Sequence, residues 1–226
     1  EFVYDAREQV RSVQRGVNIL EQFSYDSARN VHETAGSRSY RAGNVLERKG
    51  KTTYEWDDDG CLVAKKVMRP DGAEDLWRYE WNGQGFLSKV IAPDGAVTEF
   101  GYDPFGRRML KKRTRRTATD TSVEVAKFLW NEHQILHEIR KTAAASGDPV
   151  ITQRTYVHSD HDKAPVAHRD DVIAGGVKTP GQWVYYVNDP IGTPEHLVSS
   201  DGRVVGEMRR STWGVTTVTE GSQATT

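Results

Sequence analysis

The stretch YEWDDDGCL at residues 54–62 decides the fold, because it returns as YEWNGQGFL at residues 79–87. Residues 100–109, FGYDPFGRRM, follow the same order, and a Pro-Asp-Gly triplet comes after each of the first two copies, at 70–72 and 93–95. Alternation with period two places the aromatic side chains on one face of a β-strand. Asp or Asn followed by glycine forms a tight turn, because the side chain bonds to nearby backbone and glycine adopts positive φ. Each copy therefore predicts two short antiparallel strands.

The same signal recurs along the first part of the chain as an aromatic residue followed by Asp or Asn. The copies are Tyr4-Asp5, Tyr25-Asp26, Trp56-Asp57, Trp81-Asn82, Tyr102-Asp103 and Trp130-Asn131, with a weaker copy at residues 40–44. One strand pair cannot bury its aromatic face alone, so neighbouring units are expected to stack into a continuous sheet. An ordinary β-sandwich of unrelated hairpins is the alternative, and the fidelity of the repeat disfavours it.

Two local expectations follow from the equivalence of the copies. The rings of Trp56, Trp81 and Tyr102 are expected to stack as a ladder along one face of the sheet. Gly60 and Gly85 are expected to have positive φ, so a β-branched residue at either position would be costly.

Composition argues against several classes of protein. The 226 residues carry 31 Lys and Arg against 32 Asp and Glu, and a net charge of −1 argues against a dedicated nucleic-acid binder. A single cysteine, Cys61, excludes an intramolecular disulfide framework and a multi-cysteine zinc site. No stretch approaches the roughly 20 apolar residues of a membrane span. The chain begins at Glu1 in mid-pattern without a leader sequence, so we expect it to be a piece of a longer polypeptide.

The second half of the chain carries a longer motif. Residues 184–194, VYYVNDPIGTP, resemble the YYxxNDHLGTP signature of the bacterial Rhs family, with Pro190 and Ile191 where His and Leu are usual. DGRVVGE at 201–207 and TWG at 212–214 resemble the continuation of that signature. RTYV at 154–157 and APVAHR at 164–169 resemble the stretch that precedes it. With the repeats, the resemblance to Rhs proteins, and to the related YD shells of teneurins and toxin-complex proteins, covers nearly the whole chain.

The resemblance implies an all-β fold: a spiral, cocoon-like or barrel-like β-sheet shell of YD repeats, of which this chain is a fragment. It implies a non-enzymatic role, because Rhs shells enclose a C-terminal toxin domain and carry it to competitor cells, often by type VI secretion. The implied partners are the remaining shell segments, the chain's own toxin domain, a secretion chaperone and a spike protein, with no nucleic acid. The implied location is the bacterial cytoplasm before export, then outside the cell or inside the target cell. No cofactor or metal is implied.

The domain organisation is expected to be continuous. Residues 1–140 are expected to form the YD-repeat strands, and residues 141–226 the late strands of the same sheet, with the Asn-Asp-x-x-Gly-Thr-Pro signature. Small and polar residues at 142–148 and 170–181 predict two loops at the rim of the sheet, and residues 220–226 a polar tail.

Asp189 is the main candidate for catalysis. Residues 189–192, DPIG, resemble the start of the DPxGL self-cleavage motif of the family, but Thr193 stands where that motif has leucine. The flanking Asn188 and Pro194 match the upstream signature instead. We therefore favour a tight turn, in which Asp and Asn bond to local backbone and Pro190 restricts φ.

A run of metal-ligand residue types is the second candidate. It consists of residues 158–162, HSDHD, together with His168, Asp170 and Asp171. A zinc or calcium site needs several of these side chains to converge, and the run lacks the glycine and terminal glutamate of an EF-hand. A polar loop is the favoured interpretation.

Three further features have simpler explanations than function. The basic run at residues 111–116 could contact phosphates, but it is expected to be a solvated strand edge. His133 and His137 have the spacing of a zinc-binding helix, yet the stretch is expected to form two strands, 128–130 and 135–139. Cys61 is expected to be a small strand residue rather than a reactive thiol.

Two other classes of function stay open at this point. One is an autoprotease acting through Asp189, or a metallohydrolase acting through residues 158–171. The other is a module whose exposed aromatic residues bind carbohydrate or protein. The shell interpretation also predicts that residues 1–226 expressed alone aggregate, because missing neighbours would leave strand edges unpaired.

Overall fold

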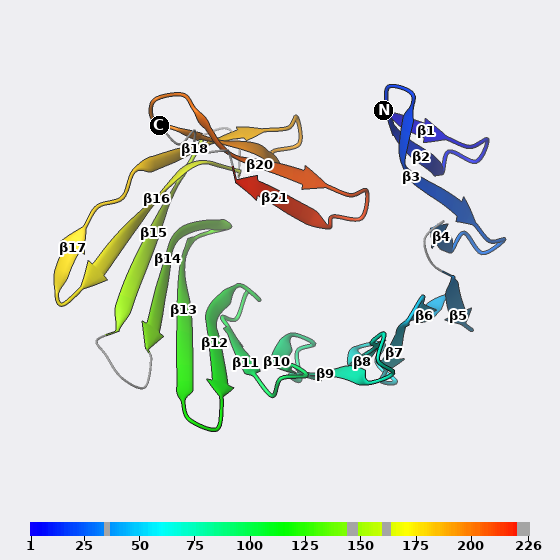
Figure 1. Cartoon of the computed structure of the whole chain (residues 1–226), viewed down its shortest axis with the longest axis horizontal. Coiled ribbons are helices and arrows are strands. Elements are labelled where there is room, and N and C mark those ends of the chain that lie inside the picture. The colour runs from blue at the N-terminus through cyan, green and yellow to red at the C-terminus, as the bar shows by residue number, and fades with distance from the viewer. Residues whose placement is uncertain (34–36, 144–148, 160–163, 221–226) are drawn as a thin grey trace. The chain divides into compact units, whose positions relative to one another are not determined.

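The computed structural model describes residues 1–33, 37–143, 149–159 and 164–220. This part of the chain forms 21 β-strands and no helix, so the predicted all-β class is confirmed. Contacts divide the chain into two compact units (Figure 1). Unit 1 comprises Glu1–Trp81 with Ser211–Val215, and unit 2 comprises Asn82–Arg210 with Thr216–Thr226. Among the described residues there is no helix of the length and hydropathy that a membrane crossing requires.

Unit 1 consists of short antiparallel strands. They are β1 (Phe2–Tyr4), β2 (Val10–Arg15), β3 (Asn18–Tyr25), β4 (Val31–Glu33), β5 (Arg38–Arg41), β6 (Val45–Lys49), β7 (Thr52–Trp56), β8 (Leu62–Met68) and β9 (Glu74–Trp81). The first four strands pair in chain order as one sheet, and β5 to β9 pair in chain order as a second series. Residues 211–215 join this unit: the Thr212 backbone N–H donates to the Glu21 carboxylate (3.0 Å), and Trp213 meets Phe23 edge to face at 5.6 Å.

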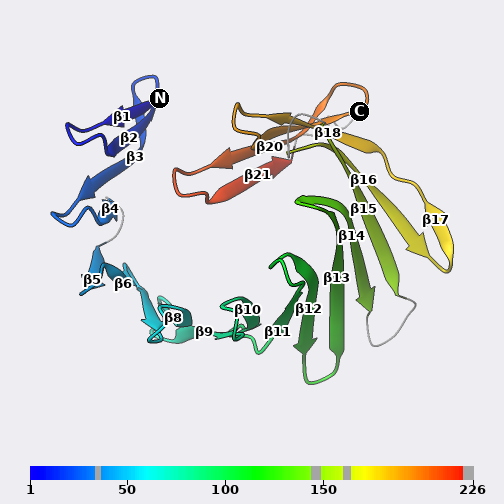
Figure 2. The same ribbon diagram turned by 180° about the vertical axis from the view of Figure 1, so that it is seen from behind.

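Unit 2 is a larger antiparallel sheet (Figure 2). Its strands are β10 (Leu87–Ile91), β11 (Val97–Tyr102), β12 (Arg108–Arg116), β13 (Thr121–Asn131), β14 (Gln134–Ala143), β15 (Val150–His158), β16 (Pro165–Ala174), β17 (Val177–Thr179), β18 (Trp183–Asn188), β19 (Pro194–Ser199), β20 (Val204–Arg210) and β21 (Thr216–Glu220). Strands β10 to β16 pair in chain order, and β18 to β21 continue the sheet.

The partner of β16 changes along its length. Its end pairs with β17 at Val172–Ala174, whereas its beginning pairs with β18 at Ala167–Arg169. The chain between β17 and β18 passes so close to β16 that a Cβ on Gly181 would lie 2.0 Å from the Asp170 carbonyl oxygen. Only glycine fits at that crossing, because any other residue would overlap the backbone of β16.

The repeated turn has one construction. The first residue is Asp or Asn, and its Oδ1 accepts backbone N–H groups of the second and fourth residues after it, at 2.8–3.1 Å. These turns begin at Asp5, Asp26, Asp57, Asn82, Asp103 and Asp189. The third residue after the Asp or Asn has positive φ, which Gly60 and Gly85 adopt as predicted (80° and 78°). The same backbone turn forms at the two Pro-Asp-Gly triplets, at residues 69–73 and 92–96.

At six turns, the aromatic residue that precedes the turn makes a hydrogen bond that the repeat pattern did not predict. Its hydroxyl or indole N–H donates to a backbone carbonyl two residues after the positive-φ residue of the preceding turn, at 2.8–3.0 Å. We call this contact the aromatic lock. The locks are Tyr25 to Val10, Tyr40 to Val31, Trp56 to Leu46, Trp81 to Leu62, Tyr102 to Leu87 and Trp130 to Arg108.

The expected ladder of stacked rings is wrong. Trp56, Trp81 and Tyr102 lie on β7, β9 and β11, and in the described structure none of these rings contacts another. Alternate strands of a sheet are about 9.5 Å apart, which is beyond the 4.5–7 Å of a ring pair. Tyr102 instead stacks on Phe86 of the preceding turn, with centroids 5.0 Å apart.

The second predicted loop is also wrong. Residues 170–174 belong to β16 and 177–179 to β17, because Gly175 and Gly176 make a tight turn that continues the pairing. In the first predicted loop, residues 142 and 143 end β14, and residues 144–148 lie outside the described residues. The division of the chain at residues 140 and 141 stays a prediction, and that boundary falls inside β14.

The core is small for the number of strands. The buried apolar residues of the described chain are Phe23, Ala64, Ala96, Ala126, Phe128 and Ala167. The buried polar residues of the same described ranges are Ser12, Glu138, His168 and Asp171. Since one layer of sheet leaves most large side chains half exposed, hydrogen bonds and ion pairs contribute much of the specific packing.

Candidate functional site

The densest polar cluster lies on one face of β14, β15, β16 and β18 in unit 2. Cross-strand pairing places Arg154 between Glu138 and Asp170 on this face. The Arg154 guanidinium donates to both oxygens of Asp170, from Nε at 2.7 Å and from Nη2 at 2.6 Å. This two-point contact raises the pKa of Arg154 and lowers the pKa of Asp170. It ties β15 to β16 by a charge-assisted pair.

Glu138 extends the cluster to β14. Its side chain is almost fully buried, and Arg140 Nε donates to its Oε1 at 2.7 Å. The Tyr156 hydroxyl donates to its Oε2 over a long 3.5 Å. Two arginines therefore face two carboxylates, and the cluster is electrically neutral while its histidines are neutral.

Aromatic rings extend the cluster to β18. The His168 ring lies between Tyr156, at 6.3 Å between centroids, and Tyr186, at 5.3 Å. Burial raises the pKa of Tyr186 to about 12 and also raises the pKa of Tyr156. His168 is 7% exposed, and among the described residues its Nδ1 has no hydrogen-bond partner. Burial, followed by the charge of Arg154, lowers its pKa.

Asp171 lies on the opposite face and is fully buried. It forms ion pairs with Lys178 Nζ at 2.9 Å and with Arg169 Nε at 2.8 Å. It also accepts hydrogen bonds from Arg169 Nη2 at 3.1 Å and from the Gly181 backbone N–H at 3.2 Å. These groups, Lys178 first, hold the pKa of Asp171 at about 2. Arg169 also lies over the Trp183 ring at 5.1 Å. Asp171 therefore lies at, and stabilises, the position along β16 where the pairing partner changes from β18 to β17.

Asp189 begins a turn like the other five. Its Oδ1 accepts the Ile191 and Thr193 N–H groups at 3.0 and 2.8 Å, so this oxygen already has two donors. The preceding Asn188 donates from Nδ2 to the Pro165 carbonyl at 3.3 Å. This geometry is the tight turn expected from the sequence.

The run of metal-ligand residue types does not converge in the part of the chain that the structure describes. His158 ends β15, whereas His168, Asp170 and Asp171 belong to β16 rather than to a loop. Asp170 and Asp171 face opposite sides of the sheet and are held by arginine and lysine. Asp160, His161 and Asp162 lie outside the described residues. Within the described ranges, no group of three or more His, Cys, Asp or Glu side chains is placed to hold a metal ion.

The basic run at residues 111–116 is not a strand edge. It lies in β12, which pairs with β11 on one side and β13 on the other. Lys112 pairs with Glu99 at 3.3 Å and Arg115 with Asp94 at 3.4 Å, so two of its charges hold β12 to the β10–β11 hairpin. Part of the run is thus a set of cross-strand ion pairs.

The remaining sequence candidates are separated from one another. His133 lies in the turn between β13 and β14, whereas His137 lies on β14 with Nδ1 3.1 Å from Thr155 Oγ1, so the strand prediction is confirmed. Cys61 closes the Asp57 turn and is not a strand residue. Burial, followed by the charges of Asp57 and Asp59, raises the pKa of its thiol, which keeps it protonated.

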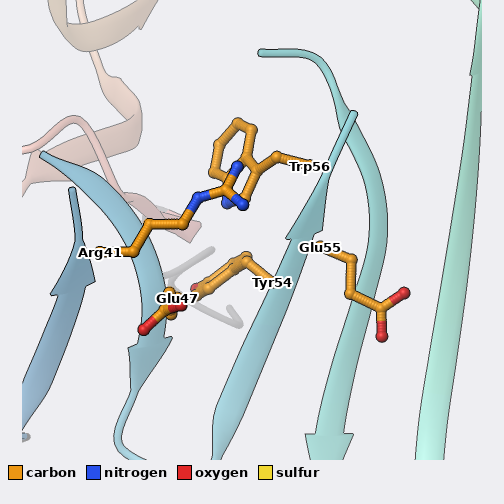
Figure 3. Close-up of a pocket in the computed structure, with 5 residues that line it drawn as sticks. All are labelled: Arg41, Glu47, Tyr54, Glu55 and Trp56. Carbon is orange, nitrogen blue, oxygen red and sulfur yellow. The ribbon is translucent and has the colours of Figure 1, made fainter. Parts of the chain in front are cut away.

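Unit 1 contains an open pocket of about 210 Å³ beside an aromatic lock (Figure 3). The residues that line it are Arg41 of β5, Glu47 of β6, and Tyr54, Glu55 and Trp56 of β7. The Arg41 guanidinium points toward the Trp56 ring, and Tyr54 lies beside Glu47. Glu55 points to the other side of β7, where it pairs with Lys66. The pocket is thus a gap between neighbouring repeats within unit 1.

Comparison with known proteins gives the family. The model that describes the teneurin YD-shell matches residues 1–224. The chain belongs to the teneurin YD-shell family. The resemblance to Rhs and YD-repeat proteins is therefore confirmed, and the YD turns and aromatic locks described above are the repeating elements of this YD shell.

Relatives of this YD-shell chain include bacterial and animal proteins. It is 30% identical over 211 residues to double-stranded DNA deaminase toxin A of Burkholderia cenocepacia, covering 86% of this chain and 14% of that protein. It is 27% identical over 201 residues to the probable deoxyribonuclease RhsB of Dickeya dadantii, covering 88% and 13%. Mouse teneurin-1 is 23% identical over 223 residues, covering 94% and 7%. The YD-shell chain thus spans about one seventh of the length of the first two relatives.

A solved structure shares the fold of this YD-shell chain. The crystal structure of TcdB2-TccC3-Cdc42 superposes with a TM-score of 0.50 at 12% identity, covering 99% of this chain and 15% of that one.

Sequence reasoning missed the Glu138–Arg154–Asp170 cluster. Its members are far apart along the chain, so no local spacing joins them. A weak signal existed, because Arg154, Tyr156 and His158 alternate on one strand with charged or aromatic residues, as do His168 and Asp170. Alternation of that kind marks a polar face, but only the strand register shows that the two faces meet.

Proposed function

We propose that this chain is a section of the β-sheet wall of an Rhs-type toxin carrier, which encloses a C-terminal toxin domain and delivers it to competitor cells by type VI secretion. One observation carries the proposal: the same turn and the same aromatic lock recur along unit 1 and into unit 2. A wall that grows by repetition needs such a locally complete unit, because each added strand pair is fastened to the pair before it.

The relatives support a link to toxins. Two of them are named as a DNA deaminase toxin and a probable deoxyribonuclease, and this chain matches only 13–14% of their length. We propose that the toxic activity resides in another part of the protein and that the present residues have a structural role. The internal pairing of the Arg140, Arg154, Glu138 and Asp170 charges supports a wall, because each charged group already has a partner.

The proposed partners and locations follow from the carrier role. The wall would pair with the remaining shell strands and surround its own toxin domain. A chaperone and a spike protein would load it in the cytoplasm, before export into the target cell.

Protease protection in the natural full-length protein tests the enclosure. We expect a protease to digest the C-terminal domain far more slowly in the intact protein than when that domain is released by denaturant. The double variant Trp81→Ala, Tyr102→Ala removes two locks and should accelerate digestion. Val17→Ala, at a fully exposed loop position, should not. Equal digestion of intact and released toxin domain would contradict enclosure.

Delivery is tested separately in a bacterial competition assay. A producer strain carrying the protein should lose its advantage over sensitive cells when its type VI sheath is inactivated. An unchanged advantage would contradict type VI delivery and leave enclosure standing.

A further inference from the structure

The joint between β16 and β18 is a short connection in the sheet of unit 2. Strands β18 to β21 pair with β10 to β16 through only three residue pairs on β16: Ala167 with Tyr185, His168 with Val184, and Arg169 with Trp183. By comparison, β15 and β16 share a register of eight pairs. His168 is therefore the central residue of a short joint.

His168 is also the residue in this joint whose charge can change near neutral pH. Its side chain is buried and its Nδ1 finds no partner among the described residues. Protonation would turn Nδ1 into a buried donor that lacks an acceptor, which is costly for a charged group.

The groups that face His168 cannot accept the new charge without losing another contact. Arg154, Tyr156 and His158 face it from β15, Asp170 from its own strand and Tyr186 from β18, with Glu138 and Arg140 beyond them on β14. Asp170 is the nearest carboxylate on β16, and Arg154 already occupies both of its oxygens. Protonated His168 would therefore repel Arg154 or compete with it for Asp170.

We propose that His168 is an acid-sensitive latch: its protonation opens the β16–β18 joint and frees β18 to β21 from the rest of the sheet of unit 2. The neutral imidazole packs between Tyr156 and Tyr186 and keeps the joint closed. An imidazolium in the same place adds a positive charge to a cluster whose two arginines and two carboxylates are already balanced.

The direction of the pH dependence follows from linkage. Burial and Arg154 lower the pKa of His168 below its ordinary value, so the open form binds the proton more tightly than the closed form. The closed joint is therefore fully stable above the ordinary pKa of histidine and loses stability as the pH falls through it.

Hydrogen exchange in the natural full-length protein, compared at about pH 7.5 and about pH 5.5 after correction for intrinsic rates, tests the latch. Amides of residues 165–169 and 183–187 should exchange about tenfold faster at the lower pH, whereas β6 to β8 should not change. His168→Gln and His168→Phe should abolish the acceleration. His196→Gln, on β19 of the same sheet, should retain it.

Three outcomes would overturn the latch: no acceleration in the natural protein, equal acceleration in all strands, or acceleration that persists in both His168 variants. If neither variant folds, an NMR titration of the unmodified protein decides instead. A His168 pKa at or above the ordinary value of about 6.5 would then contradict the proposal.

Discussion

The early strands of this protein (β1 to β13) and its late strands (β14 to β21) stabilise the same turn in two different ways. In the early strands, a tyrosine or tryptophan before the turn donates to a carbonyl of the preceding strand, as Trp81 does to Leu62. In the late strands, Asn188 and Arg210 stand at that position and donate to the carbonyls of Pro165 and Pro194. The turn therefore requires a side-chain donor that reaches one backbone carbonyl. This donor is usually an aromatic residue, but asparagine and arginine also supply it.

The two regions also differ in what binds neighbouring strands. Early contacts span 9 to 22 residues of sequence and repeat with the chain. Late contacts are ion pairs such as Arg154 with Asp170 and Arg169 with Asp171, which do not repeat. The early region should tolerate the loss of one lock as a local defect, whereas the late region depends on single, non-repeated contacts.

Gly181→Ala should give the largest effect, because the new Cβ would lie 2.0 Å from the Asp170 carbonyl. We expect a loss of about 4 kcal/mol in the free energy of unfolding of unit 2, measured by urea unfolding. Gly83→Ala is the matched control, because the φ of Gly83 is not positive and no atom of the described part of the chain lies within 4 Å of its Cβ. A loss below about 1 kcal/mol at Gly181 would mean that the β17–β18 crossing lies further from β16.

Trp81→Ala should be the most damaging change among the locks. The indole is half-buried and its N–H donates to Leu62 at 2.8 Å, so we expect a loss of about 3 kcal/mol by urea unfolding followed by circular dichroism. Tyr102→Phe removes only the hydroxyl bond to Leu87 and should cost about 1 kcal/mol. Equal losses in the two variants would show that the hydrogen bond, not ring burial, dominates a lock.

Gly60→Val should cost about 2 kcal/mol, because a β-branched residue is strained at φ 80°. No atom of the described residues lies within 4 Å of a Cβ at this position, so the backbone conformation alone is tested. Thermal unfolding of the natural and variant proteins measures the loss. A neutral substitution would show that the turn adopts another conformation.

Arg154→Met should cost about 1 kcal/mol at neutral pH, since the pair with Asp170 is partly exposed. Hydrogen bonding from Arg154 lowers the pKa of Asp170 in the folded state, so the pair stabilises above the ordinary pKa of aspartate. The difference between natural and variant proteins should shrink as the pH falls below about 4 and Asp170 becomes protonated. Urea unfolding across this range measures it, and a constant difference would assign the loss to packing.

Arg29→Gly should give the smallest effect and the opposite sign. Arg29 holds the positive-φ position of its turn at 65°, where Gly60 and Gly85 stand in later copies. Relief of this strain, offset by the greater freedom of glycine in the unfolded chain, should stabilise unit 1 by about 0.5 kcal/mol. Thermal unfolding checks the sign, and a destabilised variant would mean that the Arg29 side chain contributes more than its backbone strain costs.

Local sequence predicted the paired strands and tight turns of the repeats and none of the long-range ion pairs. Asp57 and Gly60 lie within one turn, so their spacing alone predicts its geometry, and the structure agrees. The ladder of rings failed because strand spacing, which sequence does not display, separates equivalent aromatic residues. The prediction of a loop at residues 170–181 failed because glycine and polar residues are compatible both with a loop and with two strands joined by a tight turn.

The amino-acid sequence by itself determined the all-β class, the repeated hairpin, the positive-φ glycines and the YD-shell family, because each depends on residues a few positions apart. Only the tertiary structure decided which carbonyl each aromatic residue reaches, that β16 exchanges partners at Asp171, and that His168 lies between two tyrosines at a three-pair joint. These features depend on strand register. Register brings together residues that no short spacing relates, and it is settled by the packing of the whole sheet.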